Sequence, residues 1–177
     1  TAINAMVYSR GHYSDYDGWA AAGNPGWSYA EVLPYFKKSE NNENFSDTSY
    51  HGHGGPLNVM QVKDPSKMCK VFMDACESVG IPRNADYNGA QHHGCMLFQG
   101  MVKGGERCSA SRAFIEPNLS RPNLTVITKA HVSKLLIEDK KAIGAEYFHG
   151  GQTMQVKARR EVILAGGAYA SPQLLML

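Results

Sequence analysis

Residues 161–177 constrain the fold of this chain more than any other stretch. The apolar run Val162–Leu164 predicts a buried strand, and the Gly166-Gly167 pair allows the backbone to turn sharply. Ser171 and Pro172 are typical of the N-cap and the first residue of a helix. A strand, a glycine turn and a helix in this order indicate a domain that binds a dinucleotide cofactor.

The helix expected from Pro172 reaches the last residue of the chain after about one and a half turns. Helices in globular proteins average roughly eleven residues, and this one has no C-cap. We therefore expect the sequence to be a fragment of a longer protein.

The composition is that of a globular protein, with 43% hydrophobic and 19% charged residues in a chain of 177. Its 18 basic and 16 acidic residues give a net charge of +2, which argues against a nucleic-acid-binding surface. No apolar run is long enough for a transmembrane segment, so we expect a protein that is soluble or peripheral to a membrane. The N-terminus carries no recognisable targeting signal, which leaves the compartment open.

The cysteines form no C-x-x-C motif, and Cys69 and Cys76 lie about two turns apart on an expected helix, too far for a mutual disulfide. We expect reduced thiols in the core. A zinc site is a weaker alternative, because the glycines around the first histidine pair indicate a tight turn and no carboxylate or cysteine recurs at ligand spacing. Such a site would draw on His51, His53, His92, His93 and Cys95.

Two helices are expected in the first half of the chain. The first begins after Ser28, which forms a capping box with Glu31, and it contains Pro34. Polar residues 41–49 then predict a surface loop, and Asp64-Pro65 predicts the start of the second helix. Apolar residues of the second helix follow the helical period and predict a buried stripe, which consists of Met68, Val71, Phe72, Ala75, Cys76 and Val79.

From residue 122 onward, β-branched and alternating runs replace the helical pattern. They predict an antiparallel meander with a hairpin signal at residues 149–152, followed by a fifth strand at Val162–Leu164. The four strands expected before it are residues 124–128, 132–138, 142–148 and 154–157.

Seven motifs occur along the chain, at residues 1–11, 17–19 with 23–29, 32–38, 50–57, 107–114, 121–126 and 161–177. Among them are Tyr50-His-Gly-His-Gly-Gly-Pro-Leu57 and Arg107-Cys-Ser-Ala-Ser-Arg-Ala-Phe114. In this order they resemble the glucose-methanol-choline (GMC) oxidoreductase family, especially the choline dehydrogenase-like alcohol dehydrogenases. The resemblance spans essentially all 177 residues.

The resemblance implies an α+β or α/β fold. One part is a piece of a Rossmann-like FAD-binding domain, built from the antiparallel meander and the strand, turn and helix, and the other is a piece of the GMC substrate-binding domain. Residues 1–60 are then expected to form an FAD-domain segment with a lid-like region, and residues 61–121 a substrate-domain segment. Residues 122–177 are expected to supply FAD-domain strands and the glycine turn.

The resemblance also implies contacts with the flavin. By matching motif, Asn4, Ala5, Met6 and Val7 are expected to lie along the isoalloxazine and its linker, with backbone groups meeting the flavin edge. Ile3 occupies the position where some relatives attach flavin covalently through a histidine. Noncovalent FAD is therefore the expectation.

Further cofactor contacts are implied in the last third of the chain. Val132 matches the residue whose backbone reads the adenine, and Gly166-Gly167 match the Ala-Gly pair that packs against the adenosine half. Glycine in place of alanine at position 166 removes a methyl group and should be tolerated. The family's G-x-G-x-x-G turn is expected before this segment and its catalytic histidine after it, so no residue here is assigned as catalytic, His92 and His93 included.

The sequence thus predicts a fragment of an FAD-dependent alcohol dehydrogenase or oxidase that is inactive in isolation. The family transfers a hydride from the carbinol carbon to flavin N5, with a small alcohol as substrate and oxygen or a quinone-like molecule as electron acceptor. A non-catalytic, β-rich binding module that retains the same framework is the alternative, and a metal-dependent enzyme is a weaker one. The sequence does not determine which alcohol is oxidised.

Overall fold

The computed structural model describes residues 3–177, so Thr1 and Ala2 of the first motif lie outside the described part. The chain divides into two units, residues 1–121 and residues 122–177. This division falls where the sequence changes from a helical to a strand-forming pattern. The assignment of these segments to FAD and substrate domains stays a prediction.

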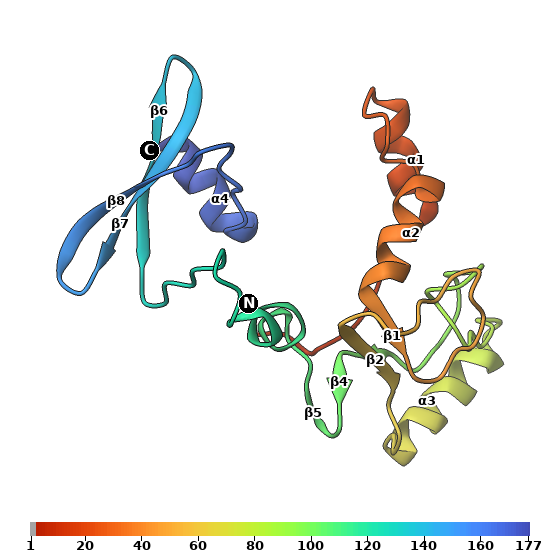
Figure 1. Ribbon diagram of the computed structural model, residues 1–177. Helices are drawn as coiled ribbons and strands as arrows, with labels where there is room; N and C mark the ends of the chain where they lie inside the picture. The colour runs from red at the N-terminus through yellow and green to blue at the C-terminus, as the bar shows by residue number, and fades with distance from the viewer. Residues whose placement is uncertain (1–2) are drawn as a thin grey trace. The chain divides into compact units, whose positions relative to one another are not determined.

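Helices α1 (Tyr13–Ala21) and α2 (Tyr29–Ser39) pack against each other in the first unit (Figure 1). The predicted capping box of α2 is confirmed, because the backbone N–H of Ser28 donates to Glu31 Oε2 at 3.1 Å. Pro34 lies inside α2, as expected. Tyr16 of α1 meets Phe36 of α2 edge to face, with ring centroids 5.8 Å apart. These contacts fix the end of α2, which runs directly into the first strand.

A three-stranded sheet contains β1 (Glu40–Asn42), β2 (Leu57–Gln61) and β3 (Gln99–Gly100) in that order. β1 pairs with β2 in parallel, and β3 pairs with β2 in antiparallel orientation. The prediction of a surface loop over residues 41–49 is wrong at its start, because Asn42 belongs to β1 and is only 5% exposed. Polar composition does not reveal that hydrogen bonds inside the protein can satisfy a polar strand.

The glycine-rich turn after His51 lies against the end of α2. A Cβ atom at Gly52 would overlap the backbone carbonyl of Lys37, and one at Gly55 would overlap the backbone of Ser39 and Glu40. Glycine is therefore required here by the close approach of two backbones.

A short hairpin of β4 (Val102–Lys103) and β5 (Glu106–Arg107) follows β3. The chain then forms a π-helical turn, η1 (Ser111–Ile115), and a 3-10 turn, η2 (Glu116–Asn118). The sulfur of Cys108, between β5 and η1, is buried and accepts the backbone N–H of Asn58 at 3.4 Å.

The four cysteines are free thiols, as expected. Cys108 lies in the core, whereas Cys69, Cys76 and Cys95 are half-buried. The prediction that all of them are core residues is therefore correct for Cys108 alone.

Helix α3 (Lys67–Ser78) begins after Ser66 rather than at Asp64-Pro65, and Ser66 Oγ accepts the backbone N–H of Met68 at 3.3 Å. The predicted buried stripe is wrong for the described structure, because Met68 and Phe72 are 67% and 66% exposed. Periodicity identifies an apolar helix face but does not identify what packs on it.

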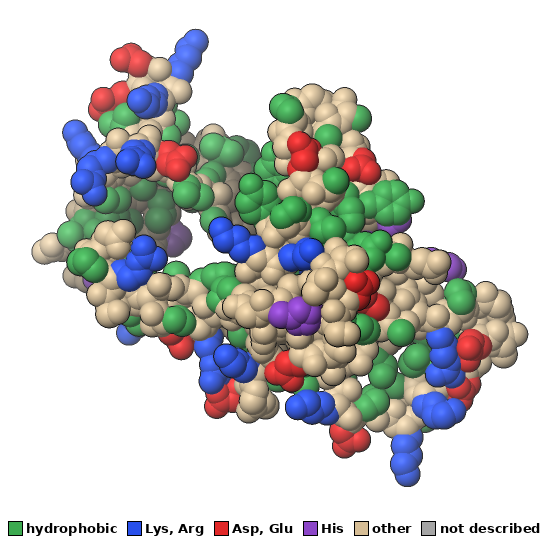
Figure 2. Space-filling model, turned by 45° about the vertical axis from the view of Figure 1, so that its right-hand side comes forward, with side chains coloured by type: hydrophobic (Ala, Val, Ile, Leu, Met, Phe, Trp, Pro, Cys, Tyr) green, Lys and Arg blue, Asp and Glu red, His purple; other side chains and the backbone are tan. Residues whose placement is uncertain are grey.

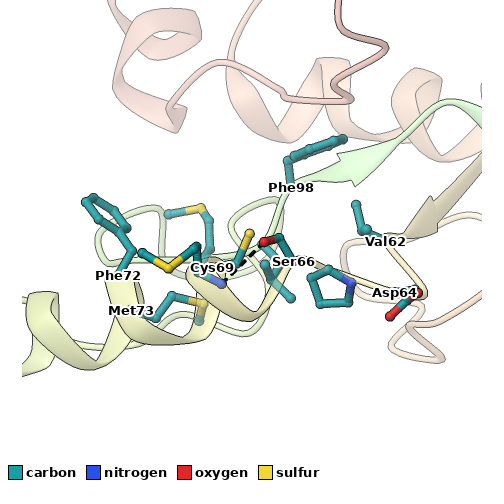
Figure 3. A pocket seen from close by; sticks show the side chains of 11 residues that line it. Val62, Asp64, Ser66, Cys69, Phe72, Met73 and Phe98 are labelled. Atoms are coloured by element: carbon teal, nitrogen blue, oxygen red, sulfur yellow. Dashed lines mark hydrogen bonds between the residues drawn. The ribbon is translucent and has the colours of Figure 1, made fainter.

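The exposed face of α3 lines an apolar groove of about 470 Å³. In Figure 3, Cys69, Phe72 and Met73 of the helix form one wall of the groove, and Phe98 and Val62 form the opposite wall. The lining is almost wholly apolar apart from Asp64 and Ser66, which stand at one end of the helix.

The second unit contains an antiparallel meander of β6 (His131–Glu138), β7 (Lys141–His149) and β8 (Gln152–Lys157). These strands and the hairpin at residues 149–152 confirm that part of the prediction. Residues 124–128, however, form no strand, and Val126 and Ile127 are about half exposed. A β-branched run becomes a strand only where a partner strand pairs with it, and no described strand does so here.

Helix α4 (Gly167–Met176) packs against β6 (Figure 1). It begins five residues before the predicted start, so Pro172 lies inside the helix. Alanines at positions 168 and 170 favour the helix and extend it toward the glycine pair. The predicted strand Val162–Leu164 is also wrong for the described residues, because no strand pairs with it and Ile163 is 80% exposed.

The described part of the chain contains no stack of several parallel strands covered by helices, so the Rossmann-like part of the fold stays a prediction. Hydrophobic side chains lie at the surface between charged ones (Figure 2). None of the helices described is long and apolar enough to span a bilayer.

Candidate functional site

The segment Asn4–Val7 runs alongside β3 and the residue after it. Val7 forms an isolated antiparallel bridge with Gly100, and the backbone N–H of Met101 donates to the Met6 carbonyl at 2.8 Å. Asn4, Ala5 and Val7 are exposed, whereas Met6 is half-buried. The segment therefore lies at the surface of the first unit, where it exposes the short side chains of Ala5 and Val7.

Met6 adopts a left-handed backbone conformation with φ of +60°. This region is disfavoured for residues that carry a Cβ atom, and such residues often occur at functional sites. The backbone N–H of Met6 donates to Asn4 Oδ1 at 2.8 Å. The guanidinium of Arg107 donates to the same Oδ1 at 2.7 Å and to the Asn4 carbonyl at 3.1 Å.

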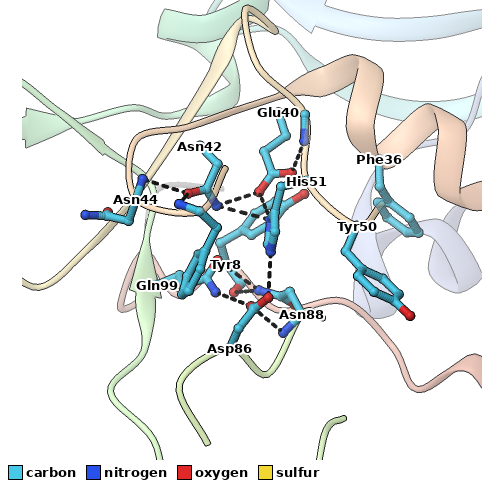
Figure 4. A network of polar contacts seen from close by, with 12 residues as sticks. Tyr8, Phe36, Glu40, Asn42, Asn44, Tyr50, His51, Asp86, Asn88 and Gln99 are labelled. Carbon is cyan, nitrogen blue, oxygen red and sulfur yellow. Dashed lines mark hydrogen bonds and ion pairs between the residues drawn. The ribbon is translucent and has the colours of Figure 1, made fainter. Parts of the chain in front are cut away.

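Buried polar residues anchor the chain directly after this segment. The Tyr8 carbonyl accepts the hydroxyl of Tyr87 at 2.7 Å and the amide of Asn88 at 3.1 Å. The backbone N–H of Tyr8 donates to the Gln99 carbonyl at 2.8 Å, and Asn88 Oδ1 accepts the backbone N–H of Arg10 at 2.9 Å. These contacts join residues about eighty positions apart and fix the base of the exposed segment (Figure 4).

Four charged side chains form the centre of this buried network. Arg10 Nη2 donates to Glu40 Oε2 at 2.7 Å, with both side chains at most 1% exposed. His51 lies between two carboxylates, with Nδ1 3.1 Å from Glu40 Oε1 and Nε2 2.7 Å from Asp86 Oδ2 (Figure 4). The network thus alternates cations and anions from four separate segments.

The charges of the network shift the pKa values of its members. Burial alone would lower the pKa of His51, but hydrogen bonds and charge from Asp86 and Glu40 raise it to about 9. Burial acts to raise the pKa of Glu40, yet hydrogen bonds from His51, Asn42 and the Gly52 amide lower it overall. The pKa of Asp86 is likewise lowered by the hydrogen bond and charge of His51, against the effect of burial.

His51 is therefore a protonated structural residue at neutral pH. The weaker prediction of a metal site drew on this histidine, but the described residues contain no group of three or more His, Cys, Asp or Glu side chains that could hold a metal ion. Glu40 and Asp86 were not predicted as partners of His51, because they lie 11 and 35 positions away, in β1 and in the loop after α3. Gly52 is the sequence signal for the Glu40 contact, because this glycine lets the turn that carries His51 lie against the end of α2.

His92 and His93, which are assigned no catalytic role from the sequence, have a different environment. The ring of His92 meets His12 edge to face, with centroids 5.1 Å apart, and burial and the His12 charge lower the pKa of His92. The carbonyl of His93 accepts the amide of Asn84 at 3.2 Å. Neither contact provides a nucleophile or an orienting acid, so the catalytic role stays unassigned.

The remaining predicted contacts lie in the second unit. Val132 belongs to β6, pairs with Tyr147 of β7 and is 37% exposed. The two glycines lie at the N-terminus of α4, where the backbone N–H of Gly166 donates to Ser171 Oγ at 2.9 Å. Since α4 packs against β6, the structure brings these three residues to neighbouring elements.

The glycine pair presents open backbone. Gly167 has φ of +83°, and a Cβ atom built on it would meet nothing within 4 Å. A Cβ on Gly166 would lie 3.1 Å from that of Ala170, so this turn leaves little room for a methyl group. The second unit therefore offers a surface at Gly167 that a flat or extended ligand can approach closely.

Residues 1–177 match the family model of the GMC oxidoreductases. The alcohol dehydrogenase [acceptor] of Pseudomonas putida is 44% identical over 179 residues, which cover 100% of this chain and 32% of that protein. The mitochondrial choline dehydrogenase of Homo sapiens is 42% identical over 177 residues, covering 100% of this chain and 30% of that protein.

A solved structure has a closely similar fold. An FAD-dependent oxidoreductase from Chaetomium thermophilum matches with a TM-score of 0.88 at 34% identity, over 98% of this chain and 32% of that one. The chain spans about a third of the length of these relatives.

Proposed function

Because the chain belongs to the GMC oxidoreductase family, as its motifs predict, we propose that it forms part of an FAD-dependent enzyme that oxidises an alcohol. The observation that carries the proposal is the family match over all 177 residues, together with relatives named as alcohol and choline dehydrogenases. Since those relatives are about three times longer, the complete protein supplies the rest of the site. The chain is then a fragment without independent activity.

Asn4, Ala5, Met6 and Val7 border the flavin in this proposal. Support comes from the exposure of the segment, its short side chains at two positions and its strained, firmly anchored backbone. A backbone without bulky side chains can approach a flat ring closely. Ile3 carries no nucleophile, so the proposed FAD is noncovalent.

Val132, Gly166 and Gly167 contact the adenosine half of FAD. The open backbone at Gly167 supports this role, because a ligand can approach it closely. The position of Gly166 and Gly167 at the start of α4 also supports it, because a helix N-terminus offers N–H groups to an anionic or polar ligand. Bound FAD would supply the hydride acceptor, flavin N5, for the hydrogen on the carbinol carbon.

The proton of the alcohol is taken by a histidine outside this chain. His51 is buried between two carboxylates and has a pKa of about 9, which leaves it protonated at neutral pH. In this proposal His51 is not the general base, and the residues that border FAD bind and orient it. The electron acceptor, oxygen or a quinone-like molecule, is left open by this proposal.

Absorbance spectra of the purified full-length protein test the proposal. We expect flavin bands that are released by denaturation, as noncovalent FAD requires, and that bleach when a primary alcohol is added without oxygen. Turnover with an artificial electron acceptor should then follow. A folded full-length protein without flavin absorbance would contradict the proposal and favour a non-catalytic binding module.

A further inference from the structure

We propose that Arg107 is a positioning residue that fixes the backbone of Asn4–Val7 in the shape that borders the flavin. The inference rests on the proposed function of that segment. It concerns a side chain that lies 103 positions away from Asn4 in the sequence and belongs to a motif without a role in the function so far.

The β4–β5 hairpin directs Arg107 toward the segment. Arg107 pairs with Val102 across the hairpin, and Val102 directly follows Met101, whose backbone N–H donates to the Met6 carbonyl. The same short run of chain therefore holds Met6 through Met101 and presents the guanidinium of Arg107 to Asn4. A movement of the hairpin would displace both contacts together.

The contact with Asn4 is bidentate. Nη1 of Arg107 donates to Asn4 Oδ1 at 2.7 Å and Nη2 donates to the Asn4 carbonyl at 3.1 Å. A guanidinium holds two oxygens in a fixed relative orientation, whereas the ammonium of lysine is a single point charge. Arg107 therefore sets both the side-chain rotamer and the peptide orientation of Asn4.

The orientation of Asn4 in turn determines the conformation of Met6. The Oδ1 atom held by Arg107 also accepts the backbone N–H of Met6, which has φ of +60°. A left-handed backbone at a methionine persists only where surrounding contacts enforce it. Without the guanidinium, Asn4 loses two of the hydrogen bonds that fix its orientation, and the segment gains access to ordinary backbone conformations.

The neighbouring arginine provides a matched control. Arg112 forms an ion pair with Glu106, both side chains are largely exposed, and no hydrogen bond or ion pair described for Arg112 reaches Asn4–Val7. Arg112→Gln removes the same charge from the same motif. It should leave the segment unchanged.

The experiment compares R107Q, R107K and R112Q in the full-length protein. At saturating FAD and alcohol, we expect R107Q to lose roughly 10- to 100-fold in kcat, as displaced reacting groups typically do. Its flavin bands should shift while its thermal midpoint stays near that of the wild type. R107K should show the same shift to a smaller degree, and R112Q should show none.

Hydrogen exchange tests the positioning without relying on the cofactor. The Met6 and Met101 amides should exchange faster in R107Q than in the wild type or R112Q, even in protein stripped of FAD. Unchanged exchange together with an unchanged flavin spectrum would overturn the inference. A wild-type protein that binds no flavin would instead contradict the proposed function, and if R107Q fails to fold, the same comparisons are made on R107K.

Discussion

The imidazole Nε2 of His51 lies 2.7 Å from Oδ2 of Asp86, across 35 positions of sequence. The other ring nitrogen is 3.1 Å from Glu40 Oε1, so the ring bridges two carboxylates. The ring of Phe45 stacks on it at 5.1 Å and excludes water from one face. A buried imidazolium between two anions makes the stability of the first unit depend on pH.

Stability should be greatest between about pH 4.5 and 6.5. His51 has a folded pKa of about 9 against an ordinary value of 6.5, so its contribution is fully present below 6.5 and is lost as the pH rises to about 9. The pKa values of Glu40 and Asp86 are lowered from 4.5 and 3.8, so their contributions are lost as the pH falls below those values. The alkaline loss from His51 is roughly 3 kcal/mol.

Chemical denaturation of the full-length protein between pH 5 and 9.5 measures this dependence. His51→Gln removes the titrating group and should flatten the alkaline part of the curve. An identical alkaline slope in the variant would show that other groups cause the loss.

Replacing Glu40 with glutamine should be strongly destabilising. Arg10 and His51 would each keep a buried positive charge without their shared carboxylate, a change that typically costs about 3–5 kcal/mol. Thermal unfolding of the full-length E40Q protein measures the loss. Asp74→Asn is the matched control, because Asp74 pairs with Lys70 and Arg83 at an exposed site, where solvent screens the ion pairs and the thermal midpoint should hardly change.

Local sequence patterns predicted those elements whose stabilising contacts are local. The capping box at Ser28 and the hairpin between β7 and β8 depend on residues within a few positions, and both are present in the structure. The strands predicted at residues 124–128 and 162–164 needed partner strands, which a single run of residues does not specify. The apolar face of α3 was recognised as apolar, but its burial depends on a neighbour.

In the candidate site, too, the sequence identified segments but not the contacts between residues far apart in the chain. Asn4–Val7 and the glycine pair were identified through family motifs, and the structure adds the strained Met6 and its anchors. Arg107 was recognised only as part of a family motif, and the structure adds that its guanidinium donates to Asn4. Side chains that meet across 103 positions leave no periodic trace in a single sequence.

Gly52→Ala should severely destabilise the first unit. The added Cβ would overlap the carbonyl of Lys37 at the end of α2, and backbone cannot move aside as a flexible side chain can. We expect a loss of about 3 kcal/mol or more, at the upper end for overpacking. Gly18→Ala in α1 is the control, since its Cβ meets nothing within 4 Å and helix propensity predicts a gain of about 0.5–1 kcal/mol. Equal thermal midpoints for the two variants would contradict this account.

Gly167→Ala should weaken FAD binding beyond its effect on stability. The glycine has φ of +83°, so alanine introduces strain of roughly 1–2 kcal/mol, and its methyl group would project into the open space proposed for the adenosine half. Gly151 in the β7–β8 turn has the same φ of +83° and the same open surroundings. G151A therefore reproduces the strain without affecting the proposed cofactor contact.

Titration of the full-length apoprotein with FAD, followed by flavin fluorescence, separates the two effects. Both variants should lose similar thermal stability, because the backbone penalty is the same. A loss of about 1.4 kcal/mol in binding corresponds to a ten-fold rise in the Kd for FAD, and we expect at least that for G167A alone. If G151A and G167A bind FAD equally well, Gly167 has no contact with the cofactor, and the adenosine half must be bound by other residues.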